Sequence, residues 1–259
     1  MLLDVQNVTL SFGGLVAVSD ASFLVNEHEI VSIIGPNGAG KTTIFNILTG
    51  LYKVDSGKAF FNGENILENK TPMDIAKLGI SRTFQNIRLF QSMRVVENVI
   101  TGTNLHCRYG FMDAVFHTKK YQAEERKHAE MAIRILKSIG LENRIHTLAK
   151  NLPYGEQRKL EIARCLATEP KLILLDEPAA GMNPQESHEL MDFIRFLRDS
   201  GYTILLIEHD MKVVMNISDR IYVFDHGKKI AEGIPEEIAH NQDVIKAYLG
   251  EEQEDAEDN

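Results

Sequence analysis

A glycine-rich stretch that ends in lysine and threonine, GPNGAGKT at residues 35–42, has the clearest chemical potential in this sequence. It fits the pattern G-x-x-x-x-G-K-[ST], in which glycines allow backbone N–H groups to turn toward phosphate oxygens. IVSII before it is typical of a buried strand, and KTTIFNILTG after it is typical of a helix that ends near Gly50. This strand–loop–helix context predicts a nucleotide phosphate site formed by Gly35, Pro36, Asn37, Gly38, Ala39, Gly40, Lys41, Thr42 and Thr43.

The end of this loop has two expected roles. Lys41 would reach the β- and γ-phosphates, and the Thr42 hydroxyl would be a ligand of Mg²⁺. The alternative is a glycine-rich turn between a strand and a helix that binds no ligand. The combination of motif and context argues against that alternative.

Two adjacent carboxylates follow a second apolar strand in LILLDEP, residues 172–178. In α/β proteins, ligands bind at the carboxyl ends of such strands. We expect Asp176 to hold Mg²⁺ through water and Glu177 to polarise the attacking water. Taken alone, an apolar strand that ends in Asp-Glu is unspecific and is also typical of an exposed acidic pair.

Two polar residues are candidates to complete the site. His209 follows the apolar run TILLIE and would contact the γ-phosphate, whereas a lone histidine at a strand end is usually structural. Gln85, in SRTFQN, would contact Mg²⁺ and the water at a junction with inserted helices, although by itself it is typical of a solvated glutamine. The candidate catalytic residues are Lys41, Gln85, Glu177 and His209, and the candidate metal ligands are Thr42, Gln85 and Asp176.

The stretch NLPYGEQRKLEIAR, residues 151–164, places helix-breaking residues directly before strong helix-forming sequence. Pro153 and Gly155 are unfavourable inside a helix, whereas QRKLEIAR favours one. We therefore expect a helix to begin here, with N–H groups that are open to an anion.

The remaining patterns predict the elements that must position these residues. The first 25 residues alternate apolar and polar, as in antiparallel strands, and Asn62-Gly63 predicts a hairpin turn. The charged stretch 118–140 has Met131, Ile135 and Ile139 at helical spacing. Strand-like runs return at 171–176, 202–208 and 219–225, separated by helical sequence at 190–199 and 211–217.

Buried strands that alternate with helices predict the α/β class with a parallel sheet. We predict one domain over residues 1–250, with an inserted helical subdomain at 92–165. The nucleotide-binding core would comprise 1–91 and 166–235 and would include an antiparallel β subdomain. Residues 236–250 would form a helical extension, and 251–259 an acidic disordered tail.

Composition narrows the class of protein. The 259 residues are 44% hydrophobic and 25% charged, typical of a globular protein. No apolar run reaches the roughly 18 residues that a membrane span needs. The net charge is −9, and the acidic final nine residues account for −6 of it, so the rest of the chain has −3. This balance argues against a nucleic-acid partner. We expect the two cysteines to be reduced thiols.

The order of these motifs resembles that of ABC-type ATPases over nearly the whole chain. That family combines a phosphate loop, a glutamine, a helical insertion, an L-S-G-G-Q signature that opens a helix, an apolar strand ending in Asp-Glu, and a histidine. The signature positions here are Leu152, Pro153, Tyr154, Gly155 and Glu156. The resemblance implies a P-loop NTPase core and a head-to-tail dimer in which Tyr154, Gly155 and Glu156 contact ATP held by the other subunit. It also implies that Phe12 stacks on adenine, although a strand phenylalanine is more often part of the core.

The sequence departs from the family pattern at three positions. Pro153 replaces the signature serine and its hydroxyl, and Tyr154 replaces the first signature glycine. Asn183 replaces the usual aspartate in the loop after the acidic strand. These departures leave the roles of individual signature residues open.

RTFQNIRLFQSMRVVENV and DEPAAGMNPQE narrow the resemblance to LivG-type ATP-binding subunits of bacterial branched-chain amino-acid importers. This similarity implies ATP hydrolysis that drives transport, with ATP and Mg²⁺ bound, at the cytoplasmic face of the inner membrane. The implied partners are a second ABC ATPase subunit (identical or a sister chain), two membrane permease subunits and a solute-binding protein.

Residues 86–108 are the candidate permease-docking face, with Ile87, Leu89, Phe90 and Met93, unless these side chains serve only helical packing. Two other functions remain open at the level of sequence. One is a soluble ABC ATPase that acts on nucleic acid or ribosomes. The other is a regulatory ATP-binding module without catalysis, which the presence of Lys41, Asp176, Glu177 and His209 disfavours.

Overall fold

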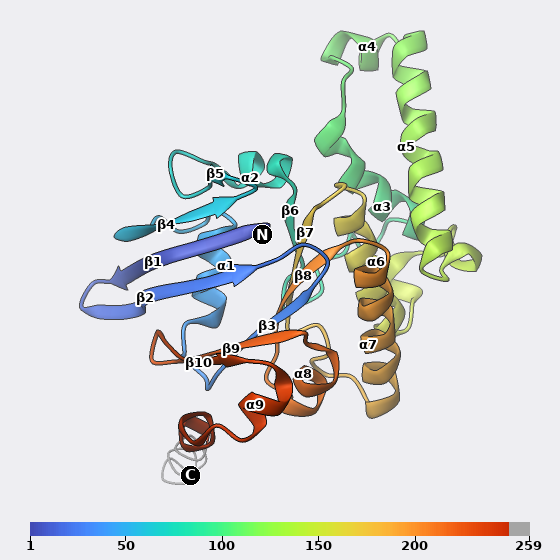
Figure 1. Ribbon diagram of the computed structural model, residues 1–259. Helices are drawn as coiled ribbons and strands as arrows, with labels where there is room; N and C mark the ends of the chain where they lie inside the picture. Colours follow the sequence, from blue (N-terminus) through green and yellow to red (C-terminus); the bar gives the residue numbers. More distant parts are fainter. Residues whose placement is uncertain (249–259) are drawn as a thin grey trace.

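The computed structural model describes residues 1–248 and contains two β-sheets with helices packed around them (Figure 1). The smaller sheet is antiparallel and has the strand order β2-β1-β4-β5. Asn62 and Gly63 both have positive φ, as the predicted tight hairpin turn requires. The strands are β1 (Leu3–Phe12), β2 (Leu15–Val25), β4 (Ser56–Phe61) and β5 (Glu64–Asn65).

The larger sheet has the order β10-β9-β3-β8-β7-β6. All neighbouring strands in it are parallel except β10, which is antiparallel to β9. The carboxyl ends of β3, β8 and β7 therefore meet at one edge, where the phosphate loop, His209 and the two acidic residues follow. The strands are β3 (Ile30–Ile34), β6 (Ile80–Arg82), β7 (Leu172–Asp176), β8 (Thr203–Ile207), β9 (Arg220–Asp225) and β10 (Lys228–Gly233).

Buried parallel strands have apolar residues on both faces, and β7 illustrates why. Leu172 and Leu174 pack into the core shared with the antiparallel sheet, while Ile173 and Leu175 pack into a second core against helices. The helices that accompany the two sheets are α1 (Lys41–Leu48), α2 (Pro72–Leu78), α7 (Pro184–Asp199), α8 (Met211–Ile217) and α9 (Pro235–Ala239). The predicted α/β fold with an antiparallel sheet is confirmed.

A helical region follows β6 and extends away from the sheets (Figure 1). Its long helix was predicted correctly. Of the residues at helical spacing, Ile139 is buried and Met131 and Ile135 are half-buried, beside the buried stripe of His128, Ala132 and Leu136. The region contains α3 (Val95–Thr103), η1 (Asn104–His106), α4 (Phe111–Val115), α5 (Lys119–Ser138), η2 (Glu142–Arg144), η3 (Ala149–Asn151) and α6 (Tyr154–Leu166).

The division into a core at 1–91 and 166–235 and a helical subdomain at 92–165 remains a prediction. After α9, the backbone at 242–248 is helical, within the expected extension. The predicted acidic tail at 251–259 lies outside the described residues. Within residues 1–248, no helix combines the length and the apolar character needed to cross a membrane.

Candidate functional site

The loop after β3 is held tightly against the rest of the protein at two of its glycines. A Cβ at Gly35 would lie 1.9 Å from the carbonyl oxygen of Phe224, and one at Gly40 would lie 2.4 Å from that of Ala17. Gly40 also has a φ of +92°, in the left-handed region that favours glycine. The G-x-x-x-x-G spacing is therefore explained by close backbone approach on both sides of the loop.

Lys41 folds back over this loop. Its ammonium Nζ donates to the carbonyl oxygens of Gly35 at 2.6 Å and Pro36 at 2.7 Å, and the side chain is buried. No acidic residue lies in the first turn of α1, so the positive end of the helix dipole is not neutralised there. Thr42 in that turn is exposed. A cation and a helix N-terminus at one place favour binding of phosphate.

The adjacent carboxylates stand at the end of β7, with different environments. Asp176 is buried as the last residue of the strand. Glu177 has a φ of +45°, which is uncommon for a residue other than glycine, and its N–H donates to Ile207 O of β8 at 2.9 Å. Strained backbone of this kind is frequent at catalytic positions, where it directs a side chain.

Gln85 and His209 both meet Glu177. Gln85 Nε2 donates to Glu177 Oε2 at 2.8 Å, and His209 Nδ1 lies 3.7 Å from the same oxygen. Gln85 and His209 are separated from Glu177 by 92 and 32 positions in the sequence, and the parallel sheet brings the three together. Neither Gln85 nor His209 is therefore an isolated polar residue, while their catalytic roles remain predictions.

Asp176 forms a contact that the sequence pattern did not predict. Arg82, at the end of β6, donates from Nη2 to Asp176 Oδ2 at 2.7 Å and from Nη1 to Asn46 Oδ1 of α1 at 2.6 Å. The Arg82–Asp176 pair is almost fully buried. It links the end of β7 to the helix that follows the phosphate loop.

Glu208 is a second residue that sequence reasoning missed. It is buried between β8 and His209, where its carboxylate accepts the N–H groups of Ala179 at 2.9 Å and His209 at 3.2 Å. Burial raises the pKa of Glu208, and the nearby charge of Glu177 adds to this effect. Through these two hydrogen bonds, Glu208 holds the backbone of the loop after Glu177 and the backbone at His209 in place.

The predicted Mg²⁺ donors form a set with few charges. In the described part of the chain, no group of three or more His, Cys, Asp or Glu residues could hold a metal. Thr42, Gln85 and Asp176 provide hydroxyl, amide and carboxylate oxygens, the donor types that Mg²⁺ prefers. Mg²⁺ commonly binds through one or two carboxylates together with substrate phosphates, so this set fits Mg²⁺ bound with a nucleotide.

Phe12 is exposed rather than part of the core. Its ring forms a T-shaped pair with that of Tyr52, with the ring centroids 5.2 Å apart. Phe12 and Leu15 are paired at the tip of the β1–β2 hairpin, and Ala17 just beyond contacts the phosphate loop at Gly40. An exposed aromatic ring on this hairpin is consistent with the predicted stacking on a base.

Helix α6 begins at Tyr154, with Pro153 as its N-cap, as predicted. Pro153 provides no side-chain capping bond. Apart from its chain neighbours and the backbone of its own helix, a Cβ at Gly155 would meet no atom of residues 1–248 within 4 Å, so the first turn faces open space at this residue. Glu156 pairs with Arg144 at 3.1 Å. The helix start is thus open at Gly155, which suits binding of a partner or an anion.

Two departures from the signature pattern have structural roles of their own. The Tyr154 hydroxyl donates to the carbonyl oxygen of Ala180, in the loop after β7, at 2.9 Å. Asn183 is the N-cap of α7, and its side chain accepts the N–H of Glu186 at 2.9 Å. The start of the signature helix is therefore attached to the loop that follows Glu177.

Replacing Tyr154 with Phe removes only this hydroxyl. We expect the free energy of unfolding to fall by about 0.5–1.5 kcal/mol, the usual net value of one hydrogen bond. Urea denaturation of the purified chain measures the change. Tyr52→Phe, at another partly exposed tyrosine, is the control and should be near neutral. Equal stability of Tyr154→Phe and the unmodified chain would show that the bond to Ala180 contributes nothing.

A buried ion pair attaches the Gln85 segment to the same helix. Arg158 is fully buried on α6 and donates to the carbonyl oxygens of Phe84 and Gln85 and to Glu161 Oε2, each at 2.9 Å. Glu161 in turn accepts the N–H of Arg88 at 3.1 Å. The backbone around Gln85 must therefore move with α6, and no local sequence signal indicated this.

Comparisons with protein families and with curated sequences both match this chain to ABC transporter proteins. Residues 18–180 match the family described as ABC transporter, and residues 228–254 match the family described as branched-chain amino acid ATP-binding cassette transporter. The chain is 49% identical over 251 residues to the high-affinity branched-chain amino acid transport ATP-binding protein LivG of Salmonella typhimurium, covering 96% of this chain and 98% of that protein. Identity to BraF of Pseudomonas aeruginosa, with the same coverage, is 47%.

Solved structures agree with these sequence matches. An ATP-binding cassette of an ABC transporter in its ADP conformation superposes with a TM-score of 0.84 at 34% identity, covering 96% of this chain and 98% of that chain. A nucleotide-free ATP-binding cassette from an ABC transporter gives 0.83 at 33% identity, covering 95% and 98%. This chain belongs to the ATP-binding cassette family of ABC transporters.

Proposed function

We propose that this chain is the ATP-hydrolysing subunit of an importer for branched-chain amino acids. ATPase activity is a property of its family, and the relatives described as branched-chain amino acid transport proteins support the solute class. The observation that carries the proposal is the cluster of Gln85 and His209 on Glu177, at the sheet edge where the phosphate loop also ends. The relatives give no support to the alternative of a soluble ABC ATPase acting on nucleic acid or ribosomes.

The geometry supports separate roles in hydrolysis for the phosphate loop, for Glu177 and for the residues that contact Glu177. The loop N–H groups and Lys41 hold the phosphates, for which Lys41 exchanges its contacts with Gly35 and Pro36 for phosphate oxygens. Glu177 accepts a proton from the attacking water, while Gln85 and His209 fix its carboxylate. Mg²⁺, held by Thr42 and Asp176, would neutralise charge on the transferred phosphoryl group.

We further propose that a second ABC ATPase subunit completes each site with the start of its α6. The open first turn at Gly155 supports this, because a Cβ placed there would meet no other part of the described chain within 4 Å, beyond its neighbours and its own helix. The space at Gly155 can admit a group from outside the protomer, and helix N-termini are ready sites for phosphate. One such contact contributes about 0.3–2 kcal/mol, so closure of two subunits depends on several contacts to bound ATP.

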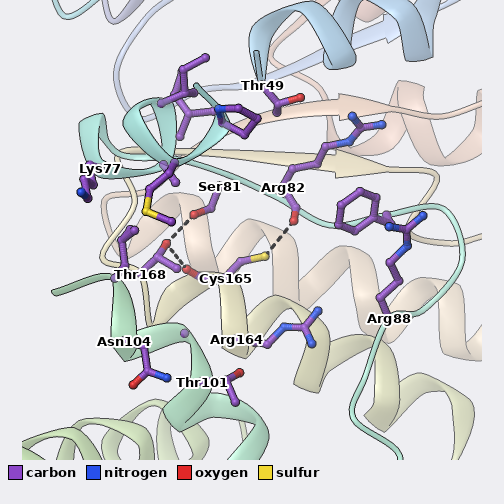
Figure 2. Close-up of a pocket in the computed structure, with 18 of the residues that line it drawn as sticks. Thr49, Lys77, Ser81, Arg82, Arg88, Thr101, Asn104, Arg164, Cys165 and Thr168 are labelled. Carbon is purple, nitrogen blue, oxygen red and sulfur yellow. Dashed lines mark hydrogen bonds between the residues drawn. The ribbon is translucent and has the colours of Figure 1, made fainter. Parts of the chain in front are cut away.

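A cavity of about 1040 Å³ between β6, α2, α3 and the end of α6 is the proposed docking site for a permease (Figure 2). Of the side chains named for the docking face at 86–108, Leu89 and Phe90 line this cavity, whereas Ile87 and Met93 do not. At its floor, the Cys165 thiol donates to the carbonyl oxygen of Arg82 at 3.3 Å, and burial raises the pKa of Cys165 to about 12.

The cavity connects to the catalytic residues through Arg82. Its carbonyl accepts the Cys165 thiol at the cavity floor, and its guanidinium binds Asp176. Phe84 and Arg88, on either side of Gln85, also line the cavity. A permease segment bound there would displace Phe84, which precedes Gln85 in the sequence, or Arg82, which is hydrogen-bonded to Asp176. This supports a peripheral position of the chain beside membrane subunits.

The dimer proposal predicts the effect of Gly155→Asp. The new carboxylate would face the phosphate of ATP on the partner, and we expect ATP-dependent dimerisation to be lost. Sedimentation with Mg-ATP, in a Glu177→Gln background that prevents hydrolysis, measures the dimer. Gly155→Ala is the matched control, because alanine adds no charge and its Cβ has free space. Undiminished dimerisation of Gly155→Asp would make the assignment of this helix to the partner's site wrong.

A further inference from the structure

The outward face of α4 is apolar, the reverse of a normal surface helix. Phe111, Met112, Val115 and Phe116 are between 53% and 82% exposed. Asp113, on the same short helix, is half-buried and faces the protein. Surface helices usually bury their apolar stripe, and clustered exposed apolar groups mark a contact with another body. The tip of the helical region therefore has the composition of a binding surface.

This tip is a built structure rather than a loose loop. The Asp113 carboxylate accepts the N–H of Gly110 at 3.1 Å and the hydroxyl of Thr118 at 2.9 Å. The Tyr109 hydroxyl donates to Glu125 of α5 at 2.8 Å. These bonds hold the single acidic side chain of the helix inward and leave the apolar face outward.

Three exposed cations flank the apolar face, namely Arg108, Lys119 and Lys120. Lys120 lies 3.9 Å from Asp113, and the acidic groups at this tip are held in contacts with the protein: Asp113 at Gly110 and Thr118, Glu124 at the N–H of Arg108, and Glu125 at Tyr109. Aromatic and basic side chains together are the combination that suits the headgroup region of a bilayer, because rings enter the apolar boundary while cations meet anionic phosphates. The tip has exposed cations beside an exposed apolar face, and an anionic lipid surface complements both.

The position of the tip agrees with such a partner. Asn104, Leu105 and Cys107, which lead into this segment, line the proposed permease cavity. Figure 1 shows α4 at the far end of the helical region, beyond α3. We propose that α4 and its basic flanks bind the anionic phospholipid surface beside the permease. This orientation rests on the proposed function, but the affinity for lipid does not.

The test is flotation of the purified full-length chain with vesicles. We expect binding to vesicles that contain phosphatidylglycerol, little binding to pure phosphatidylcholine, and weaker binding at high salt. Phe111→Ser/Phe116→Ser should lower the bound fraction about tenfold or more, because each exposed ring contributes apolar contact area. Lys119→Gln/Lys120→Gln should lower it less. Phe196→Ser, at an exposed phenylalanine on α7, is the matched control and should bind as the unmodified chain does.

Equal flotation of Phe111→Ser/Phe116→Ser and the control would overturn the proposal. So would an unmodified chain that ignores both kinds of vesicle while the double serine variant loses capture by a reconstituted permease, because the patch would then be a protein contact. ATP hydrolysis by each variant is measured separately and should stay unchanged. A chain without ATPase activity that still binds anionic vesicles would contradict the proposed function and leave the lipid site intact.

Discussion

Glu177→Gln is expected to lower the rate of ATP hydrolysis by about 10²–10⁴-fold while ATP binding remains close to that of the unmodified chain. The substitution keeps size and hydrogen-bonding shape but removes the charge that accepts a proton from water. Binding depends on the loop at 35–42 and on Lys41, which the substitution does not touch. Uncleaved ATP should then accumulate in a stable dimer of the variant.

Steady-state phosphate release and equilibrium binding of labelled ATP measure the two halves of this prediction. Glu130→Gln, at an exposed carboxylate on α5, is the control and should hydrolyse ATP normally. Near-normal hydrolysis by Glu177→Gln would exclude Glu177 as the general base. In that case the pairing of Gln85 with its carboxylate would have only a structural purpose.

The phosphate loop and the acidic strand were predictable because their signals are local. Strand, glycine spacing, lysine and helix follow one another within residues 30–48, and β7 runs directly into its two carboxylates. The α5 helix was equally clear from periodicity, although its most buried stripe includes residues that the spacing did not single out. His128 and Ala132 line that face because the neighbouring helices decide which stripe is covered. Periodicity alone favoured the larger apolar side chains.

The contacts that unite the site were not predictable, because each joins segments far apart in the sequence. Arg82 and Asp176 are 94 positions apart, and Arg158 meets Gln85 across 73. Arginine is common in helices and at strand ends, so nothing in the local sequence distinguishes Arg82 or Arg158 from other arginines. Glu208 was overlooked for the same reason, since its role appears only when β7 and β8 are adjacent.

These long-range contacts also indicate how the parts of the cassette move together. Arg158 attaches the Gln85 segment to the body of α6, and Tyr154 attaches the start of α6 to the loop after Glu177. The same helix therefore contacts both sides of the hydrolysis site in its own chain, while its first turn faces outward at Gly155. A displacement of the cavity lining at Phe84 and Arg88 would therefore be transmitted through α6 to the Gln85 segment, to the loop after Glu177 and to the first turn at Gly155.

Arg158→Met is the most informative test of this coupling. Breaking a buried ion pair by removing one partner leaves an uncompensated charge, here on Glu161, and we expect a loss of about 3–5 kcal/mol in the free energy of unfolding. The carbonyl groups of Phe84 and Gln85 lose their donor as well. Urea denaturation measures the loss, and Arg134→Met, at an exposed position on α5, should be near neutral.

The double variant Arg158→Met/Glu161→Leu separates the ion pair from its backbone contacts. It removes the stranded carboxylate, so its destabilisation should be smaller than the sum of the two single changes by roughly 1–3 kcal/mol. Full stability should not return, because the N–H of Arg88 and the two carbonyls still lack partners. Additive single and double effects would contradict a coupled pair. Arg158→Met within about 1 kcal/mol of the unmodified chain, the net value of one hydrogen bond, would mean that α6 and the Gln85 segment are held together by packing alone.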